Sequence, residues 1–193
     1  MKTNVSNTKK CTGGIKATAL CGMFAALAAA ISFAENLSGV NALLPVPGVK
    51  LGLANIAVTG AVLCVGGAGA MAVVLIRCLA TFLCFGNAVS FAISLTGGML
   101  SAAVSALLVK RRIFHGGSGM CTLIGISAAS AFSHSLGQLI AASATVGSMA
   151  VFSAFPVICS LSVVTGTLTG AAANAVYTAL CGTKLAKSYI SLD

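Results

Sequence analysis

Acidic residues are nearly absent from this chain: among its 193 residues, only Glu35 and Asp193 carry a carboxylate. Two isolated carboxylates cannot form the paired acid and base of many hydrolases, nor the clustered aspartates that hold Mg²⁺ against a diphosphate. The GxxxxGK(S/T) loop that cradles nucleotide phosphates is missing as well. We therefore expect a protein that is not an enzyme, needs no cofactor or metal, and relies on a partner for any ATP hydrolysis.

Charge of either sign is also scarce. Charged residues make up 7% of the chain, whereas a soluble domain carries about 25%. Hydrophobic residues make up 58%, and the mean hydropathy is +1.06. This composition excludes a soluble protein. Because a membrane-spanning helix needs about 20 apolar residues, the chain has room for about six such helices in the lipid bilayer and for no separate soluble domain.

The cations are gathered in short groups. Nine of the eleven Lys and Arg residues flank apolar stretches: Lys2, Lys9, Lys10, Lys16, Lys110, Arg111, Arg112, Lys184 and Lys187. Such groups mark cytoplasmic flanks under the positive-inside rule. Nucleic acid is not an expected partner despite the net charge of +9, because the groups lack interleaved aromatic residues. The eight cysteines show no CxxC spacing, which favours small buried side chains over metal ligands.

Glycine, proline and charge divide the apolar sequence into six predicted helices. The first covers about 17–34, and a long connection over 35–50 follows it, since Pro45 and Pro47 resist a helix. The other five are two short helices within 51–85, separated by glycines at 66–69, and one each at about 88–109, 120–145 and 157–181.

Charge placement sets the expected topology. The apolar stretch 113–183 has room for two or three spans, and two of them return the C-terminal lysines to the side of the other cations. We therefore expect an all-α integral membrane protein. It is a six-transmembrane-helix bundle over 17–183, with cytoplasmic termini over 1–16 and 184–193.

Small residues recur at four-residue intervals on several predicted helices. Gly166 and Gly170 form a GxxxG pair, which lets two helix backbones pack closely. The first predicted helix carries the widest small-residue face: Ala25, Ala26, Ala29 and Ala30. We expect packing within the bundle for most of the small residues, and for this face the docking of another membrane protein.

Polar side chains are expected together in the outer half of the bundle: Glu35, Lys50, Asn55, Arg77, Asn87, His134 and Gln138. At 1.5 Å per residue, Arg77 lies roughly 12 Å below the outer end of its helix. A charge inside a membrane costs at least about 2.5 kcal/mol and therefore faces the bundle interior. We expect a substrate-binding pocket with two cations against one carboxylate, suited to an anionic or hydrogen-bonding solute. The alternative is that Arg77 pairs with Glu35 or caps carbonyls, and serves the fold alone.

Several motifs resemble those of a known family. They are the run Pro45-Val-Pro-Gly-Val-Lys-Leu-Gly-Leu-Ala-Asn55, then Arg77, Phe85-Gly-Asn87, the Ser94 to Ser101 stretch, and His134-Ser-Leu-Gly-Gln138. In kind and in order they resemble the Gx transporter family, also labelled heptaprenyl diphosphate synthase component I, over about 16–181. The HNLGQ motif usual in that family reads HSLGQ here, so no role of an asparagine carries over to Ser135.

That family in turn resembles the substrate-binding S components of energy-coupling factor (ECF) transporters. The resemblance implies an S-component-like fold, with an outward-facing pocket gated by the loop after the first helix. It also implies that small residues of the first helix contact a coupling subunit. The expected function is uptake of a small anionic or polar solute across a bacterial plasma membrane, together with a coupling subunit and ATPases. The other family label leaves an alternative: a non-catalytic membrane subunit of polyprenyl diphosphate or isoprenoid-quinone biosynthesis.

Overall fold

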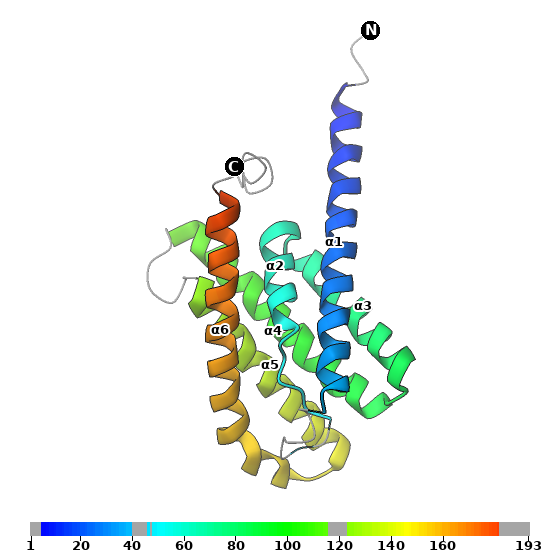
Figure 1. Cartoon of the computed structure of the whole chain (residues 1–193), viewed down its shortest axis with the longest axis vertical. Coiled ribbons are helices and arrows are strands. Elements are labelled where there is room, and N and C mark those ends of the chain that lie inside the picture. Colours follow the sequence, from blue (N-terminus) through cyan, green and yellow to red (C-terminus); the bar gives the residue numbers. More distant parts are fainter. Residues whose placement is uncertain (1–4, 40–45, 47, 116–122, 182–193) are drawn as a thin grey trace.

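A computed structural model of the chain describes residues 5–39, 46, 48–115 and 123–181. Within these residues the chain forms α-helices and one short 3-10 helix, and no strand (Figure 1). The elements are α1 (Val5–Leu37), α2 (Asn55–Val65), α3 (Gly67–Phe85), α4 (Ala88–His115), α5 (Leu123–Val146), η3 (Met149–Ala154) and α6 (Phe155–Cys181). The described part of the chain is all-helical, as the sequence predicts.

Five helical segments are long and apolar enough to cross a membrane: Gly14–Leu37, Gly67–Phe85, Ala88–Arg111, Leu123–Val146 and Met149–Asn174. Large apolar side chains on their outer surfaces, such as Leu83 and Leu107, are exposed. Exposed apolar surface on this scale suits contact with lipid. The described bundle therefore has the architecture of a multi-pass α-helical membrane protein.

The short helix α2 departs from the prediction of six spanning helices. It has 11 residues, which extend about 16 Å, roughly half of the hydrocarbon thickness of a bilayer. The sequence predicts its start at Leu51, but the structure begins it at Asn55, because Gly52 adopts a φ of +78° that a right-handed helix does not use. Gly66, with a φ of +87°, ends α2 before α3 begins, as the glycines predict.

α2 lies at the centre of the bundle. It contacts each of the other five α-helices, and Figure 1 shows it between α1 and α6. Ala57, Val58 and Ala61 are buried within the larger hydrophobic core. The helix has no charged residue on any face, which is the pattern of a helix surrounded by protein.

α1 is longer than predicted at both ends. It runs from Val5 to Leu37 instead of 17–34, because its basic residues are compatible with a helix, and the chain leaves the helix only near Gly39, at a φ of +68°. The prediction that Glu35 opens the connection is wrong. Glu35 lies instead in the last turn of α1, where its side chain is buried.

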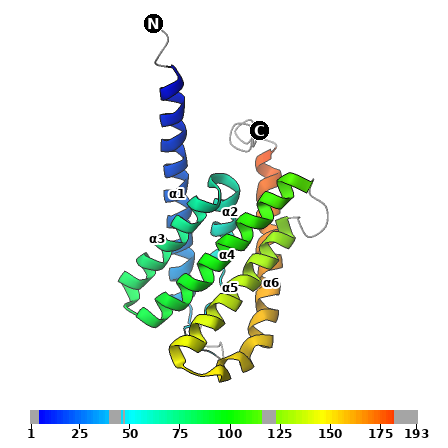
Figure 2. The same cartoon turned by 180° about the vertical axis from the view of Figure 1, so that it is seen from behind.

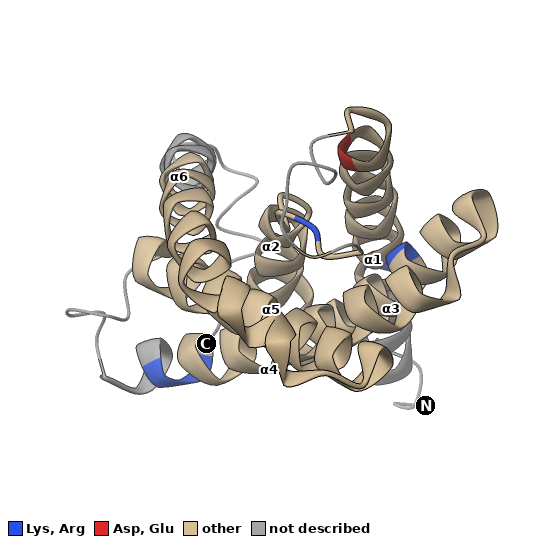
Figure 3. Cartoon of the chain, turned by 90° about the horizontal axis from the view of Figure 1, so that it is seen from below, with Lys and Arg blue, Asp and Glu red and all other residues tan. Residues whose placement is uncertain are grey.

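The two ends of the bundle carry different parts of the chain. The start of α1, the end of α4 and the end of α6 lie at one end, and the α3–α4 and α5–α6 connections lie at the other (Figures 1 and 2). Basic residues gather at the end of α4, where Lys110 and Arg111 are exposed (Figure 3). This arrangement fits a topology with both termini on one side, and which side faces the cytoplasm stays a prediction. Lys2, Lys184 and Lys187 lie outside the described residues.

The small residues divide between internal packing and exposure. A Cβ at Gly166 would lie 2.7 Å from Cβ of Ala131, and one at Gly170 would lie 2.8 Å from Cα of Ile124, so α5 and α6 pack closely there. The prediction of internal packing is confirmed for this pair.

On α1 the predicted docking face is partly wrong. Ala26 and Ala30 are exposed and Ala29 is half-buried, but Ala25 is only 3% exposed and belongs to the core. Neighbouring residues of a helix point about 100° apart, so Ala25 and Ala26 cannot both contact the same partner helix. The exposed small-residue face consists of Gly22, Ala26, Ala30 and Ala34.

Candidate functional site

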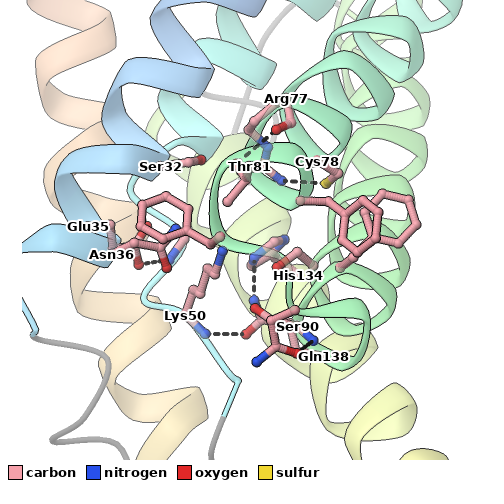
Figure 4. Close-up of a pocket in the computed structure, with 16 residues that line it drawn as sticks. Ser32, Glu35, Asn36, Lys50, Arg77, Cys78, Thr81, Ser90, His134 and Gln138 are labelled. Atoms are coloured by element: carbon pink, nitrogen blue, oxygen red, sulfur yellow. Dashed lines mark hydrogen bonds between the residues drawn. The ribbon is translucent and has the colours of Figure 1, made fainter.

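A cavity of about 220 Å³ lies between α1, α3, α4, α5 and the segment 48–54, near the α3–α4 connection (Figure 4). Six of the seven residues predicted for a pocket line it: Glu35, Lys50, Arg77, Asn87, His134 and Gln138. Figure 4 labels five of them, Glu35, Lys50, Arg77, His134 and Gln138, and shows their side chains converging from α1, α3, α5 and the loop. The convergence of these residues is the part of the site that the sequence predicts correctly.

Asn55 does not line this cavity. Its Oδ1 accepts a hydrogen bond of 2.9 Å from Ser101, the Ser101 hydroxyl lies 2.7 Å from that of Ser130, and Ser105 donates to Ser130 at 2.8 Å. We call these four residues the serine cluster. It joins α2 to α4 and α5 inside the bundle. The sequence predicts Asn55 in the pocket because it places the start of the helix too early.

Arg77 is a buried charge with few partners. Its side chain is 4% exposed and lines the cavity from α3. Its Nη2 lies 4.0 Å from Sγ of Cys78, and its Nε has no hydrogen-bond partner among the described residues. A guanidinium offers five donors, and a buried charge is stable only when it is paired. Arg77 is therefore suited to bind an anion in the cavity.

α4 leaves room for the guanidinium at Gly98. A Cβ at that position would lie 2.9 Å from Nη2 of Arg77 and 2.6 Å from Cγ1 of Val74. Distances below 3.0 Å force one of the groups to move. The glycine thus sets where the guanidinium of Arg77 lies.

Glu35 connects the cavity to the loop. Its Oε1 accepts a hydrogen bond of 3.0 Å from the backbone N–H of Gly52. The carboxylate also interacts electrostatically with both Lys50 and Arg77. The attraction between the charges of Arg77 and Glu35 supports the alternative, in which Arg77 serves Glu35 alone. Nε of Arg77, however, has no hydrogen-bond partner among the described residues.

His134 and Gln138 hold the loop from α5. The amide oxygen of Gln138 accepts from the backbone N–H of Lys50 at 3.3 Å, and its amide nitrogen lies 2.9 Å from Nε2 of His134. Because the amide nitrogen can only donate, this contact fits a neutral imidazole that carries its proton on Nδ1. Irregular backbone inside a membrane bundle needs partners of this kind for its polar groups.

Gly52 is required where the loop meets His134. Its φ of +78° lies in the left-handed region, and a Cβ would lie 2.9 Å from Cδ2 of His134. Both the conformation and the close approach exclude other residues. These two constraints therefore explain why position 52 of the sequence run from Pro45 to Asn55 is a glycine.

The side chain of Lys50 supplies the second cation of the cavity. It is 9% exposed, and Figure 4 shows it between Glu35 and His134. Burial lowers the pKa of Lys50, the charge of Glu35 raises it in part, and the charge of Arg77 lowers it again. The Lys50 ammonium therefore loses its proton at a lower pH than a free lysine does.

Sequence reasoning missed an aromatic wall. Phe82, Phe85 and Phe91 also line the cavity, and the ring centroids of Phe82 and Phe91 lie 5.3 Å apart. The spacing from Arg77 to Phe85 is eight residues, so both lie on one face of α3. That spacing is the signal that could have identified Phe85.

Ser94 was also missed. It lines the cavity from α4, it is buried, and its hydroxyl has no partner among the described residues. It lies one helical turn from Gly98, and hence on the same face of α4. The family resemblance includes the stretch that begins at Ser94, but nothing in its composition separates Ser94 from the other hydroxyl residues of 88–109.

Comparison with known proteins identifies one related family. A family model described as heptaprenyl diphosphate synthase component I matches residues 24–176, more than three quarters of the chain. The matched range includes every residue that lines the cavity. No curated protein and no solved structure matches the chain.

Proposed function

The chain belongs to the heptaprenyl diphosphate synthase component I family, and from that premise we propose that it is the substrate-binding subunit of an ECF-type transporter in a bacterial plasma membrane. In this function it binds a small anionic or polar solute in the cavity. A separate coupling subunit and ATPases supply the energy for uptake. The observation that carries the proposal is a buried arginine, without a partner at Nε among the described residues, at a cavity inside a membrane bundle.

The loop over 48–54 supports a binding role. Two of its backbone N–H groups are held by side chains, Gly52 by Glu35 and Lys50 by Gln138. Bonds of this kind contribute about 0.5–3 kcal/mol each, and with the buried side chain of Val49 they hold the segment against the cavity. The segment thereby brings Lys50 and Gly52 to the lining of the cavity.

The family description favours a second function, as a non-catalytic membrane subunit of polyprenyl diphosphate or isoprenoid-quinone biosynthesis. In that function the chain binds a prenyl diphosphate or anchors enzymes. A chain of seven prenyl units does not fit into a polar cavity of about 220 Å³. We therefore place solute binding first and keep enzyme anchoring as the competing outcome of the experiment below.

The exposed small-residue face of α1 is the surface that we assign to the coupling subunit. Ala26 and Ala30 lie one helical turn apart and both are exposed. Small residues let a second helix approach closely in lipid, where packing rather than apolar burial drives association. Ala25 is part of the core and takes no direct part in this contact.

Purification of the tagged full chain from its native membranes tests the proposal. We expect ATPases and a second multi-pass membrane protein to copurify in fixed ratio, identified by mass spectrometry. Ala30→Trp should abolish this association and leave the melting temperature unchanged. The matched control is Ala172→Trp, at an exposed alanine of α6, which should keep the association. A prenyl diphosphate synthase in fixed ratio, without ATPases, contradicts the proposal and supports the second function.

A further inference from the structure

The residues that line the cavity are ordered by depth. Arg77 lies eight residues before Phe85, the last residue of α3, which places it roughly 12 Å deeper. α4 runs the opposite way, from Asn87 just before its start inward to Ser94. The cavity therefore has a polar floor around Arg77 and Ser94 and a mouth near Phe85 and Asn87.

The charges that line the cavity do not cancel. Lys50 and Arg77 face a single carboxylate, that of Glu35. Glu35 interacts with both cations and also accepts a hydrogen bond from the loop. One positive charge thus remains without a counter-charge among the residues of the cavity. A monoanion balances it, whereas a diphosphate brings an excess of buried negative charge.

Part of the wall between floor and mouth is aromatic. Phe82 of α3 and Phe91 of α4 pack against each other with ring centroids 5.3 Å apart, tilted by 48°. Phe85 packs in the same way on Phe33 of α1, with centroids 5.8 Å apart. Aromatic rings favour offset or edge contacts with a further ring by about 0.5–1.5 kcal/mol beyond the area buried. The walls therefore favour a flat, aromatic body over a flexible aliphatic one.

Resting on the proposed function, we propose that the solute is a small aromatic monocarboxylate that binds with its carboxylate at the floor of the cavity. The carboxylate accepts hydrogen bonds from the guanidinium of Arg77 and from the hydroxyl of Ser94, which rotates about its Cα–Cβ bond to donate. The ring lies against the phenylalanines that line the cavity. A volume of about 220 Å³ limits the solute to one or two rings, because it is below the roughly 300–1,000 Å³ of pockets for drug-sized ligands.

Three probes with matched controls test this inference on the purified full chain in lipid nanodiscs. The probes are benzoate, indole-3-carboxylate and quinoline-2-carboxylate, and the controls are their neutral primary amides, hexanoate and phenyl phosphate. We expect at least one aromatic carboxylate to bind and to raise the melting temperature. Its amide, hexanoate and phenyl phosphate should bind at least tenfold more weakly by calorimetric titration.

Variants locate the binding. Arg77→Gln should lower the affinity for the carboxylate at least thirtyfold, and Ser94→Ala should lower it about fivefold. The melting temperature without ligand should stay within a few degrees of the wild-type value in both variants. Arg77→Lys serves if the glutamine variant does not fold, because it keeps the charge and loses the planar fork that binds a carboxylate with two bonds.

Three results overturn the inference: no aromatic carboxylate binds, one of the controls (an amide, hexanoate or phenyl phosphate) binds equally well, or affinity is unchanged in both Arg77 variants. Each of them leaves the proposed function standing, because a solute of another class can still occupy the cavity. The proposed function fails separately, through the copurification experiment, if a prenyl diphosphate synthase replaces the ATPases.

Discussion

Two polar groups lie inside the same bundle, and they differ in charge and in how their hydrogen bonds are satisfied. The serine cluster is neutral. Its hydroxyls bond to one another and to Oδ1 of Asn55, although the amide nitrogen of Asn55 has no partner among the described residues. The cavity group of Glu35, Lys50 and Arg77 is charged and borders an open volume.

The difference separates a role in the fold from a role in binding. A neutral hydrogen-bonded network fixes the position of the helices that contribute to it, here α2, α4 and α5. A charged group with an unpaired cation is costly inside a membrane unless something from outside completes it. We therefore expect changes in the serine cluster to alter stability, and changes at Arg77 to alter binding.

Loss of the guanidinium should have the largest effect on binding. Removing one partner of a buried charged contact costs about 2–5 kcal/mol, so Arg77→Gln should lower the affinity for an aromatic carboxylate at least thirtyfold. Calorimetric titration and thermal melting of the same preparation measure the two roles separately. A large fall in melting temperature, restored by adding Glu35→Gln, would show instead that Arg77 serves the fold through Glu35.

Loss of a hydroxyl in the serine cluster should have the opposite signature. Ser101→Ala leaves Asn55 and Ser130 without their shared partner, which costs about 1–3 kcal/mol of stability. The affinity for the carboxylate should stay unchanged. Ser143→Ala is the matched control, because its exposed hydroxyl bonds only to its own helix, at the carbonyl of Ile140. Equal melting temperatures for the two variants would contradict the structural role of the cluster.

The charged half of this contrast can be predicted from sequence, because polar residues are rare in apolar stretches and have to face the bundle interior. That rule alone predicts that Arg77, Lys50 and His134 lie together. It fails for Asn55, because depth along a helix depends on where the helix begins, and the turn that follows Gly52 shifts that point by four residues.

Two other features are beyond a pattern read along one chain. Ala25 and Ala26 are both alanines, and each is followed by another alanine four residues later. Only packing against neighbouring helices decides which of the two faces outward. The aromatic wall depends on α3 and α4 crossing so that Phe82 meets Phe91. The sequence of an apolar helix does not show which residue a phenylalanine will pack against.

A methyl group at Gly98 should weaken binding without removing a charge. In Gly98→Ala the added Cβ displaces the guanidinium of Arg77 or the side chain of Val74, and we expect about a tenfold loss of carboxylate affinity. Gly22→Ala is the control, because nothing lies within 4 Å of its added Cβ. Gly98 has no positioning role if the two variants bind the carboxylate equally. Fluorescence or calorimetric titration at one pH is sufficient.

The smallest expected effect is a dependence on pH through Lys50. Burial lowers the pKa of Lys50 below that of a free lysine, so the cavity loses one positive charge as pH rises through that lowered value. The affinity for a carboxylate should therefore fall at alkaline pH, by about fivefold, the equivalent of roughly 1 kcal/mol. Lys50→Met should remove the dependence. An affinity that rises with pH, or an unchanged profile in Lys50→Met, would contradict it.

The most direct test of the central claim is the small molecule that the protein itself retains. The full chain, purified in mild detergent, is denatured, and the released compounds are quantified by untargeted mass spectrometry beside Arg77→Gln and Ser101→Ala preparations of equal folded content. We predict an aromatic monocarboxylate near one per chain in wild type and Ser101→Ala, and its absence from Arg77→Gln. Equal amounts of it in Arg77→Gln, or a prenyl diphosphate in its place, would contradict the assignment of the cavity to an aromatic carboxylate.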